Sequence, residues 1–292
     1  MSDTCILIST CKRYRPVAEW TASRIAREWE NHPPLRYAGL HDTRDWMAVN
    51  LDAVDKVLKE GFRWLYLVLD DHPPVGPCNG SALNNELPRL AAELEAVNIG
   101  LLGWGQRRER EGTVLGETYA KLLRNEASFR WKFSLHPSLW HADSLRELLE
   151  IRSAQFPVSE RTPWNFERHR DGAQGPVGKR LLENTYRVHG GAMSTNGALG
   201  AEAARQTGLL CYDIYRFALR ILRGQRARNE FDRKNLWLYC YYRGPYPILW
   251  SGAMRQGVPS GDFENFLRFT RRTELRRGWD KVKKQIDQPR PC

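Results

Sequence analysis

The sequence predicts an α/β fold in which a mostly parallel sheet is flanked by helices. Short, uninterrupted apolar segments of the kind found in strands buried on both faces occur along the first hundred residues. They alternate with segments whose apolar residues recur at helical spacing. Several apolar segments also end in polar or acidic residues, and parallel α/β sheets bind ligands at the carboxyl ends of their strands.

The first strand is expected at Cys5–Thr10, and Pro16 then suits the first turn of a helix. A second strand is expected at Leu35–Leu40, followed by a helix with Asp42 or Thr43 as its N-cap. The apolar face of the first helix comprises Ala18, Ala22, Ile25 and Trp29, and that of the second comprises Trp46, Val49, Ala53 and Val57.

The third strand is expected at Trp64–Leu69 and the fourth at Ile99–Trp104. A further strand is predicted at Trp131–Leu135, and Ser144 with Glu147 forms a capping-box pattern before another helix. The helix between the third and fourth strands is predicted from Leu83, Leu87, Leu90, Leu94 and Val97. The glycine-rich segment Gly172–Gly178 lacks the Lys-Ser/Thr of a P-loop and is interpreted as a connection or lid.

Three polar segments follow the first three strands: Thr10–Tyr14, His41–Asp45 and Asp70–His72. Because parallel strands end at the same edge of a sheet, these segments are expected to line one crevice. Two carboxylates and an imidazole at that edge could bind a hard divalent cation. The alternative is that an aspartate caps the next element and His72 faces solvent, but the position at a buried strand end favours a functional site.

Three segments follow one another along the chain: LDDHPP (Leu69–Pro74), LHPSLWHADSLRELL (Leu135–Leu149) and TPWNFE (Thr162–Glu167). This ordered set resembles the GT-A class of nucleotide-sugar glycosyltransferases, in particular bacterial enzymes of envelope-polysaccharide and glycolipid assembly. The resemblance covers about residues 4–190. It implies a GT-A-like, Rossmann-like sheet, a divalent metal (Mn or Mg), and transfer of a sugar from a nucleotide-diphosphate donor to a hydroxyl acceptor.

The resemblance also implies roles for individual residues on the donor side. Thr10, Arg13, Asp42 and Asp70 would bind the donor. Asp71 would bind the metal, or His72 would if the D-x-H triplet of polypeptide N-acetylgalactosaminyltransferases is the better match, and the sequence leaves both open.

On the acceptor side, His136, Trp140 and Trp164 would face the acceptor, with core packing as the alternative for the two tryptophans. Glu167 would be the general base that takes the proton of the acceptor hydroxyl, with Asp171 in reserve. The alternative for Glu167 is a salt bridge with Arg168 or Arg170.

The net charge of +11 lies in the last quarter of the chain. From Arg216 to the end there are 18 basic and 7 acidic residues, which indicates an anionic partner or a solvated basic surface. An amphipathic helix is predicted there, and it could lie on an anionic membrane or pack on the catalytic region. The sequence contains no recognised nucleic-acid-binding module, so nucleic acid is not expected as the partner. The apolar stripe of that helix comprises Ile214, Phe217, Ala218, Ile221 and Leu222.

Two regions are expected: residues 1–195, which would bind the nucleotide-sugar and catalyse transfer, and residues 196–292, a basic and aromatic extension on the acceptor or membrane side. The six cysteines are scattered, without zinc-binding spacing, and predict free thiols. The absence of a signal peptide or an 18-residue apolar run predicts a cytoplasmic protein, peripheral on the inner face of the membrane if the basic region binds lipid.

The leading hypothesis is therefore a metal-assisted glycosyltransferase that acts on a glycan or lipid-linked acceptor. The alternative is a non-catalytic α/β module that binds a nucleotide, a glycan or nucleic acid. A third hypothesis is a hydrolase or phosphotransferase that uses the same aspartates on a phosphate.

Overall fold

The computed structural model describes most of the first hundred residues and parts of the remainder. The described residues are 3–41, 45–101, 113–114, 121–125, 133–167, 181, 183–189, 214–215, 217–231, 241–242, 244–249, 251–255, 257–270 and 272–287. The predictions that lie outside them include Asp42 as a donor-binding residue, Asp171 as the reserve base, the connection at Gly172–Gly178, and the alternative salt bridge of Glu167 with Arg168 or Arg170.

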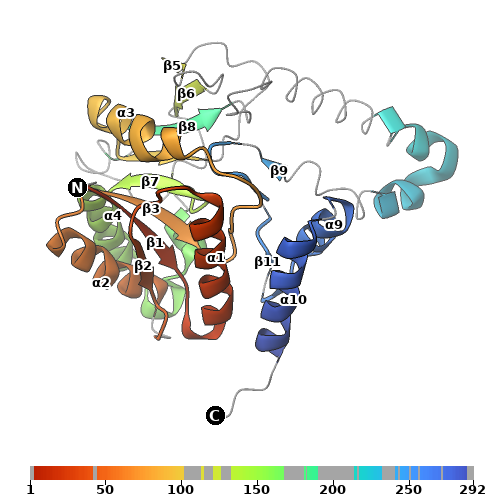
Figure 1. Ribbon diagram of the computed structural model, residues 1–292, viewed down its shortest axis with the longest axis horizontal. Coiled ribbons are helices and arrows are strands. Elements are labelled where there is room, and N and C mark those ends of the chain that lie inside the picture. Colours follow the sequence, from red (N-terminus) through yellow and green to blue (C-terminus); the bar gives the residue numbers. More distant parts are fainter. Residues whose placement is uncertain are drawn as a thin grey trace.

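Among the described residues, eight strands form one sheet (Figure 1). They are β1 (Thr4–Ser9), β2 (Leu35–Ala38), β3 (Trp64–Leu69), β4 (Asn98–Gly100), β5 (Thr113–Val114), β6 (Lys121–Arg124), β7 (Ser138–His141) and β8 (Thr185–His189). The strand order is β2-β1-β3-β7-β4-β8-β6-β5. Parallel pairs join β1 to β2 and β3, and β4 to β8, whereas β7 runs antiparallel between β3 and β4. The predicted α/β class is confirmed, and β7 is a reversed strand that was not predicted.

Helices cover both faces of the sheet (Figure 1). They are α1 (Arg15–Glu28), α2 (Trp46–Lys59), α3 (Leu87–Glu93) and α4 (Ala142–Gln155). Ile6 and Ile8 of β1 pack with residues of α1 and α3, whereas Cys5 and Leu7 pack with residues of α2 and α4. This division follows from the alternation of side chains along a strand, and it buries β1 completely.

Some element boundaries differ from the prediction. Asp45 caps α2, since its Oδ1 accepts a hydrogen bond from the N–H of Ala48 at 2.7 Å. The capping box at Ser144 was wrong, because α4 begins two residues earlier and Ser144 lies inside its first turn. Val97 is not helical, because α3 ends at Glu93. The first part of the predicted helix is a π-helical turn (η2, Ala82–Glu86) that precedes α3.

The predicted strand at Trp131–Leu135 was wrong in its described part. The chain is irregular from residue 133 to 137, and β7 follows it. The strand predicted at Ile99–Trp104 corresponds in its described part to β4, which is shorter.

The C-terminal region packs on α1. It contains α9 (Gly261–Thr270) and α10 (Thr273–Asp287), preceded by two small antiparallel pairs: β9 (Tyr241–Tyr242) with β10 (Ile248–Leu249), and β11 (Met254–Arg255) with β12 (Val258–Pro259). Trp20 of α1 contacts Trp279, with 5.1 Å between ring centroids, and Phe263 at 5.9 Å. The basic helix α10 is therefore docked on α1 through its apolar side.

The segment from residue 214 to 231 is helical at residues 214–215 and 217–231. In Figure 1 this segment lies at the edge of the molecule, beyond α9. None of the helices in the described part of the chain is both long and apolar enough to cross a membrane.

Candidate functional site

The candidate site lies at the edge of the sheet where β1, β2 and β3 end. Ser9 is aligned with Ala38 of β2 and with Leu69 of β3, so the three parallel strands end at the same level. Because β7 is antiparallel, its first residue lies at this edge too, where Ser138 pairs with Leu67. The residues after β1 and β3 are therefore brought together with the residues before β7.

Thr10 and Asp70 contact each other directly across this edge. The hydroxyl of Thr10 donates to Oδ2 of Asp70 at 2.5 Å, and the N–H of Asp70 donates to the carbonyl of Ser9 at 3.0 Å. The hydroxyl of Thr21, on α1, donates to the carbonyl of Asp70. Thr10 and Asp70, which the sequence assigned to donor binding, thus contact each other, and Asp70 is also held by hydrogen bonds to β1 and α1.

The carboxyl of Asp70 is surrounded by protein although part of the residue reaches the surface. The pKa of Asp70 is raised to about 8, mainly by burial and secondly by the neighbouring charge of Asp71. The hydrogen bond from Thr10 and the charge of His72 act in the opposite direction. Asp70 is therefore expected to be protonated at neutral pH in the unliganded protein.

Asp71 lies against His72, and the C-terminal region holds it in place. Oδ1 of Asp71 lies 2.8 Å from Nδ1 of His72, and the carbonyl of Asp71 accepts from the N–H of Ala253 at 2.6 Å. Gly252 has a φ of +65°, and a Cβ added there would lie 2.6 Å from Oδ2 of Asp71. A side chain at this position would be strained by the positive φ and would require Asp71 to shift, so glycine favours the close approach of the C-terminal region to Asp71.

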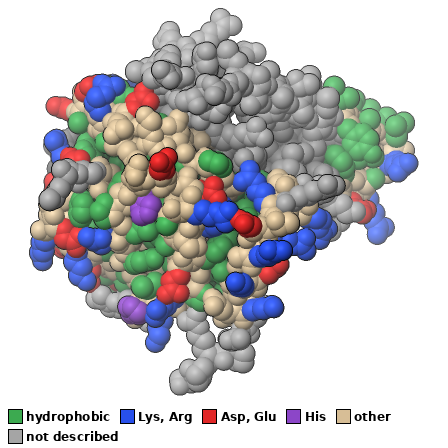
Figure 2. Space-filling view, viewed as in Figure 1, with side chains coloured by type: hydrophobic (Ala, Val, Ile, Leu, Met, Phe, Trp, Pro, Cys, Tyr) green, Lys and Arg blue, Asp and Glu red, His purple; other side chains and the backbone are tan. Residues whose placement is uncertain are grey.

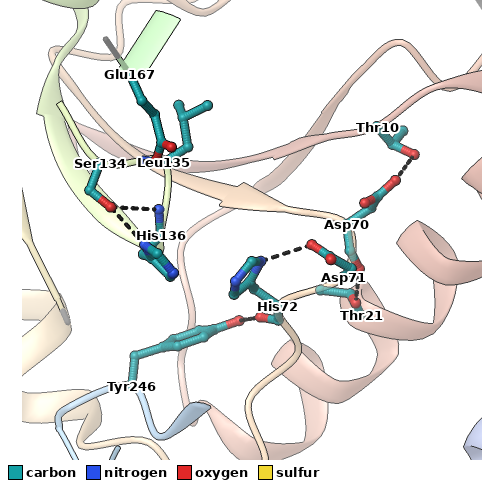
Figure 3. Close-up of polar contacts among 10 residues, drawn as sticks. All are labelled: Thr10, Thr21, Asp70, Asp71, His72, Ser134, Leu135, His136, Glu167 and Tyr246. Carbon is teal, nitrogen blue, oxygen red and sulfur yellow. Dashed lines mark hydrogen bonds and ion pairs between the residues drawn. The ribbon is translucent and has the colours of Figure 1, made fainter. Parts of the chain in front are cut away.

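His72 lies between Asp71 and His136 (Figure 3). Its ring is perpendicular to that of His136, with 5.2 Å between centroids, and the residue is only 6% exposed. The hydroxyl of Tyr246 donates to the carbonyl of His72 at 3.0 Å. The imidazole of His72 is thus enclosed by Asp71 on one side and His136 on the other. In this position it can orient Asp71, but it is poorly placed to contact a ligand.

Glu167 holds the turn that carries His136. Its Oε1 accepts a hydrogen bond from the N–H of Leu135 at 2.6 Å, and Ser134 Oγ lies 2.7 Å from Nδ1 of His136 (Figure 3). Burial is the largest effect on Glu167 and raises its pKa, while the hydrogen bond from Leu135 and the charge of His72 lower it. Glu167 therefore lies close enough to His72 to be affected by its charge, but it is enclosed at 8% exposure.

The two tryptophans assigned to the acceptor lie in opposite environments. Trp140 is fully buried between Phe133 and Phe166, and its indole N–H donates to Ser138 Oγ at 2.7 Å. Its assignment to acceptor binding is therefore corrected to core packing. Trp164, on the short helix α5 (Pro163–Glu167), is 72% exposed and presents a free aromatic surface.

Arg13 lies in a 3-10 turn after β1 (η1, Lys12–Tyr14), where its guanidinium carbon is 5.6 Å from the ring centroid of Tyr14. Tyr14 was missed by the sequence analysis. Burial raises the pKa of its hydroxyl, and the charges of Asp70 and Asp71 raise it further. A Cβ added at Gly257 would lie 3.1 Å from the hydroxyl of Tyr14, so the C-terminal region also lies close to this hydroxyl.

The described residues contain no group of three or more His, Cys, Asp or Glu side chains arranged to hold a metal ion. Asp71 could offer a carboxylate to a divalent cation at this edge, and the remaining ligands would then be water or substrate oxygens. Mg²⁺ commonly binds through one or two carboxylates and substrate phosphates.

Thr21, Tyr246 and Gly252 were also missed by the sequence analysis. Thr21 carried a local signal, as a polar residue beside the apolar positions Ala18 and Ala22 of one helix. Tyr246 and Gly252 carried none, because they reach the site through contacts with residues more than 170 positions away.

Comparison of the chain with protein-family models, with curated proteins and with solved structures gave no match.

Proposed function

We propose that the protein is a GT-A-type glycosyltransferase that transfers a sugar from a nucleotide-diphosphate donor to a hydroxyl acceptor with the help of Mn or Mg. One observation carries the proposal: two adjacent carboxylates follow β3 at the edge where parallel strands end, and one of them accepts a hydrogen bond from Thr10, directly after β1. Nucleotide ligands of parallel α/β sheets bind at this edge. The acceptor class that follows is a glycan or a lipid-linked sugar.

On the donor side, the two carboxylates have different roles. Asp70, neutral at pH 7 and held by Thr10, offers both a hydroxyl donor and a carbonyl acceptor to the ribose or sugar hydroxyls. Asp71, whose Oδ1 lies 2.8 Å from Nδ1 of His72, is the side chain that would hold the metal. This favours Asp71 over His72 as the ligand. When bound, the metal would stabilise the negative charge of the departing diphosphate.

On the acceptor side, Glu167 is the proposed general base. Its raised pKa suits proton abstraction, because a base works best when its pKa approaches the operating pH. His136 and the exposed Trp164 would line the path of the acceptor, where the apolar face of an indole can stack on a sugar ring.

The test is the release of nucleoside diphosphate from UDP-, GDP-, CDP- and TDP-sugars in the presence of Mn²⁺ and an extract of bacterial membrane lipids as acceptor source. We expect release from one class of donor, and loss of release in Asp71→Asn but not in Asp52→Asn, which removes an exposed carboxylate on α2. Metal-dependent binding of a nucleotide without turnover of any sugar would favour the non-catalytic module. Release of inorganic phosphate from the nucleotide would favour a hydrolase.

A further inference from the structure

The helical segment from residue 214 to 231 folds back on itself. Gly224 has a φ of +77°, the left-handed conformation that ends a helix, and nothing lies within 4 Å of a Cβ added there. The rings of Tyr215 and Phe231 lie 5.0 Å apart, centroid to centroid. In one straight helix these residues would be about 24 Å apart, so the segment is a helical hairpin with Gly224 at its tip.

The first helix of this hairpin exposes an apolar surface. Leu222, next to the tip, is 80% exposed, and Figure 2 shows hydrophobic side chains gathered on this projecting part of the molecule. The exposed apolar residues of the hairpin are Ile214, Tyr215, Phe217, Ile221 and Leu222. Contiguous exposed apolar side chains of this kind mark an interaction surface.

Arginines outnumber acidic residues in this hairpin. From Ile214 to Phe231 the sequence contains five arginines and one acidic residue, Glu230. At 100° per residue, Phe217 and Ile221 share one side of the first helix, and Arg223 lies on the opposite side. The described arginines of the hairpin are Arg220, Arg223, Arg226 and Arg228.

Exposed apolar residues together with arginines favour one class of binding partner over the others. Nucleic acid would use the arginines but would gain nothing from Ile221 and Leu222 at the tip. A second copy of the chain, bound through the same patch, would bring like charges together. An anionic lipid surface accepts both features, because apolar side chains enter the acyl boundary while basic side chains contact phosphate headgroups.

We propose that the hairpin around Gly224 inserts its tip into the interface of an anionic membrane and holds the protein there. The inference stands on the hairpin alone and does not require the proposed catalytic function. It assigns the membrane contact to the hairpin and not to α10, whose apolar residues are occupied against α1.

The test is sedimentation of the full chain with phosphatidylcholine vesicles, with and without phosphatidylglycerol. We expect binding only to the anionic vesicles. Ile221→Asp/Leu222→Asp should weaken it at least tenfold, and Arg223→Gln/Arg226→Gln by roughly twentyfold or more, since each basic residue near an anionic surface contributes about fivefold.

Matched controls are Val158→Asp, an exposed apolar residue elsewhere, and Arg276→Gln/Arg277→Gln on α10. Both should bind like the wild type, and all variants should keep the wild-type melting temperature because the changed side chains are exposed. Wild-type binding by the tip variant, an equal loss in the α10 variant, or displacement by an oligonucleotide with no lipid binding would overturn the proposal.

Discussion

Asp70 and Asp71 are neighbours in the chain, but their carboxyls have different partners. Asp70 is enclosed and bonded to Thr10, whereas Asp71 is paired with His72 and touched by Gly252. Two adjacent carboxylates in a shared site resist simultaneous ionisation. The two carboxyls therefore differ in their surroundings before any ligand arrives, and the pKa of Asp70 is the one that is raised.

The raised pKa of Asp70 predicts that the protein loses stability as the pH rises. In the unfolded chain the group ionises near 3.8 and in the folded protein near 8, so the folded state binds the extra proton between these values. The free energy of unfolding should then fall by roughly 1 kcal/mol per pH unit between about pH 5 and 8. Urea unfolding in metal-free buffer measures this slope.

Asp70→Asn removes the titrating group and keeps the shape of the side chain. Its pH slope should be shallower than that of the wild type, while Asp52→Asn should keep the wild-type slope. An unchanged slope in Asp70→Asn would show that another group causes the pH dependence.

Gly252 provides a second residue-scale prediction. Gly252→Ala places a Cβ against Oδ2 of Asp71 and should cost about 1–3 kcal/mol of unfolding free energy. Gly61→Ala is the matched control: Gly61 has a φ of +87° but nothing within 4 Å, so only the backbone cost of about 1 kcal/mol applies. If Gly252→Ala and Gly61→Ala destabilise the protein equally, the side chain of Asp71 moves away from the added Cβ without a measurable cost.

Glu167 provides the prediction for catalysis. If it is the base, Glu167→Gln should lower kcat about a hundredfold or more with less effect on KM. Wild-type activity should decrease as the pH falls through a pKa above the ordinary 4.5 of glutamate, because the base must be deprotonated. A variant that loses activity only together with its folded structure would indicate that Glu167 serves the turn at Leu135 alone.

At the scale of elements, β1, β3, α1 and α2 could be predicted from local pattern because each buries one continuous apolar run or stripe. The antiparallel direction of β7 could not, since the direction of a strand depends on its neighbours and not on its own residues. The reversal at Gly224 was missed for a different reason. The apolar stripe of that helix was correct, but a lone glycine is compatible with either a continuous helix or its end.

The docking of α10 on α1 gives the element-scale prediction. A Cβ added at Gly278 would lie 2.7 Å from the indole nitrogen of Trp20, so the helices approach each other through this glycine. Gly278→Ala should destabilise the protein by about 1–3 kcal/mol, although alanine is the better helix former. Gly261→Ala, at the start of α9 where nothing lies within 4 Å, should be neutral or slightly stabilising. Thermal unfolding compares the two.

At the scale of the whole molecule, the candidate site is assembled from three distant parts of the chain. Thr10, the Asp70–His72 segment and the turn before β7 could be anticipated, because they lie at strand ends or in recognisable motifs. The C-terminal contributions of Tyr246 and Ala253 could not be, because tertiary packing alone brings them to Asp71 and His72. The same packing brings part of the basic C-terminal region beside the site. The proposed membrane-binding hairpin belongs to that region.

The central claim is that this edge of the sheet binds a nucleoside diphosphate through Asp71 and a divalent metal. The most direct measurement is the melting temperature with UDP, GDP, CDP or TDP, each with and without Mn²⁺. We predict that one diphosphate, at about a hundred times its Kd, raises the melting temperature by roughly 5 °C, and only when Mn²⁺ is present. The substitution Asp71→Asn should abolish this shift. The absence of a shift with all four diphosphates, or a metal-dependent shift that survives in Asp71→Asn, would contradict the claim.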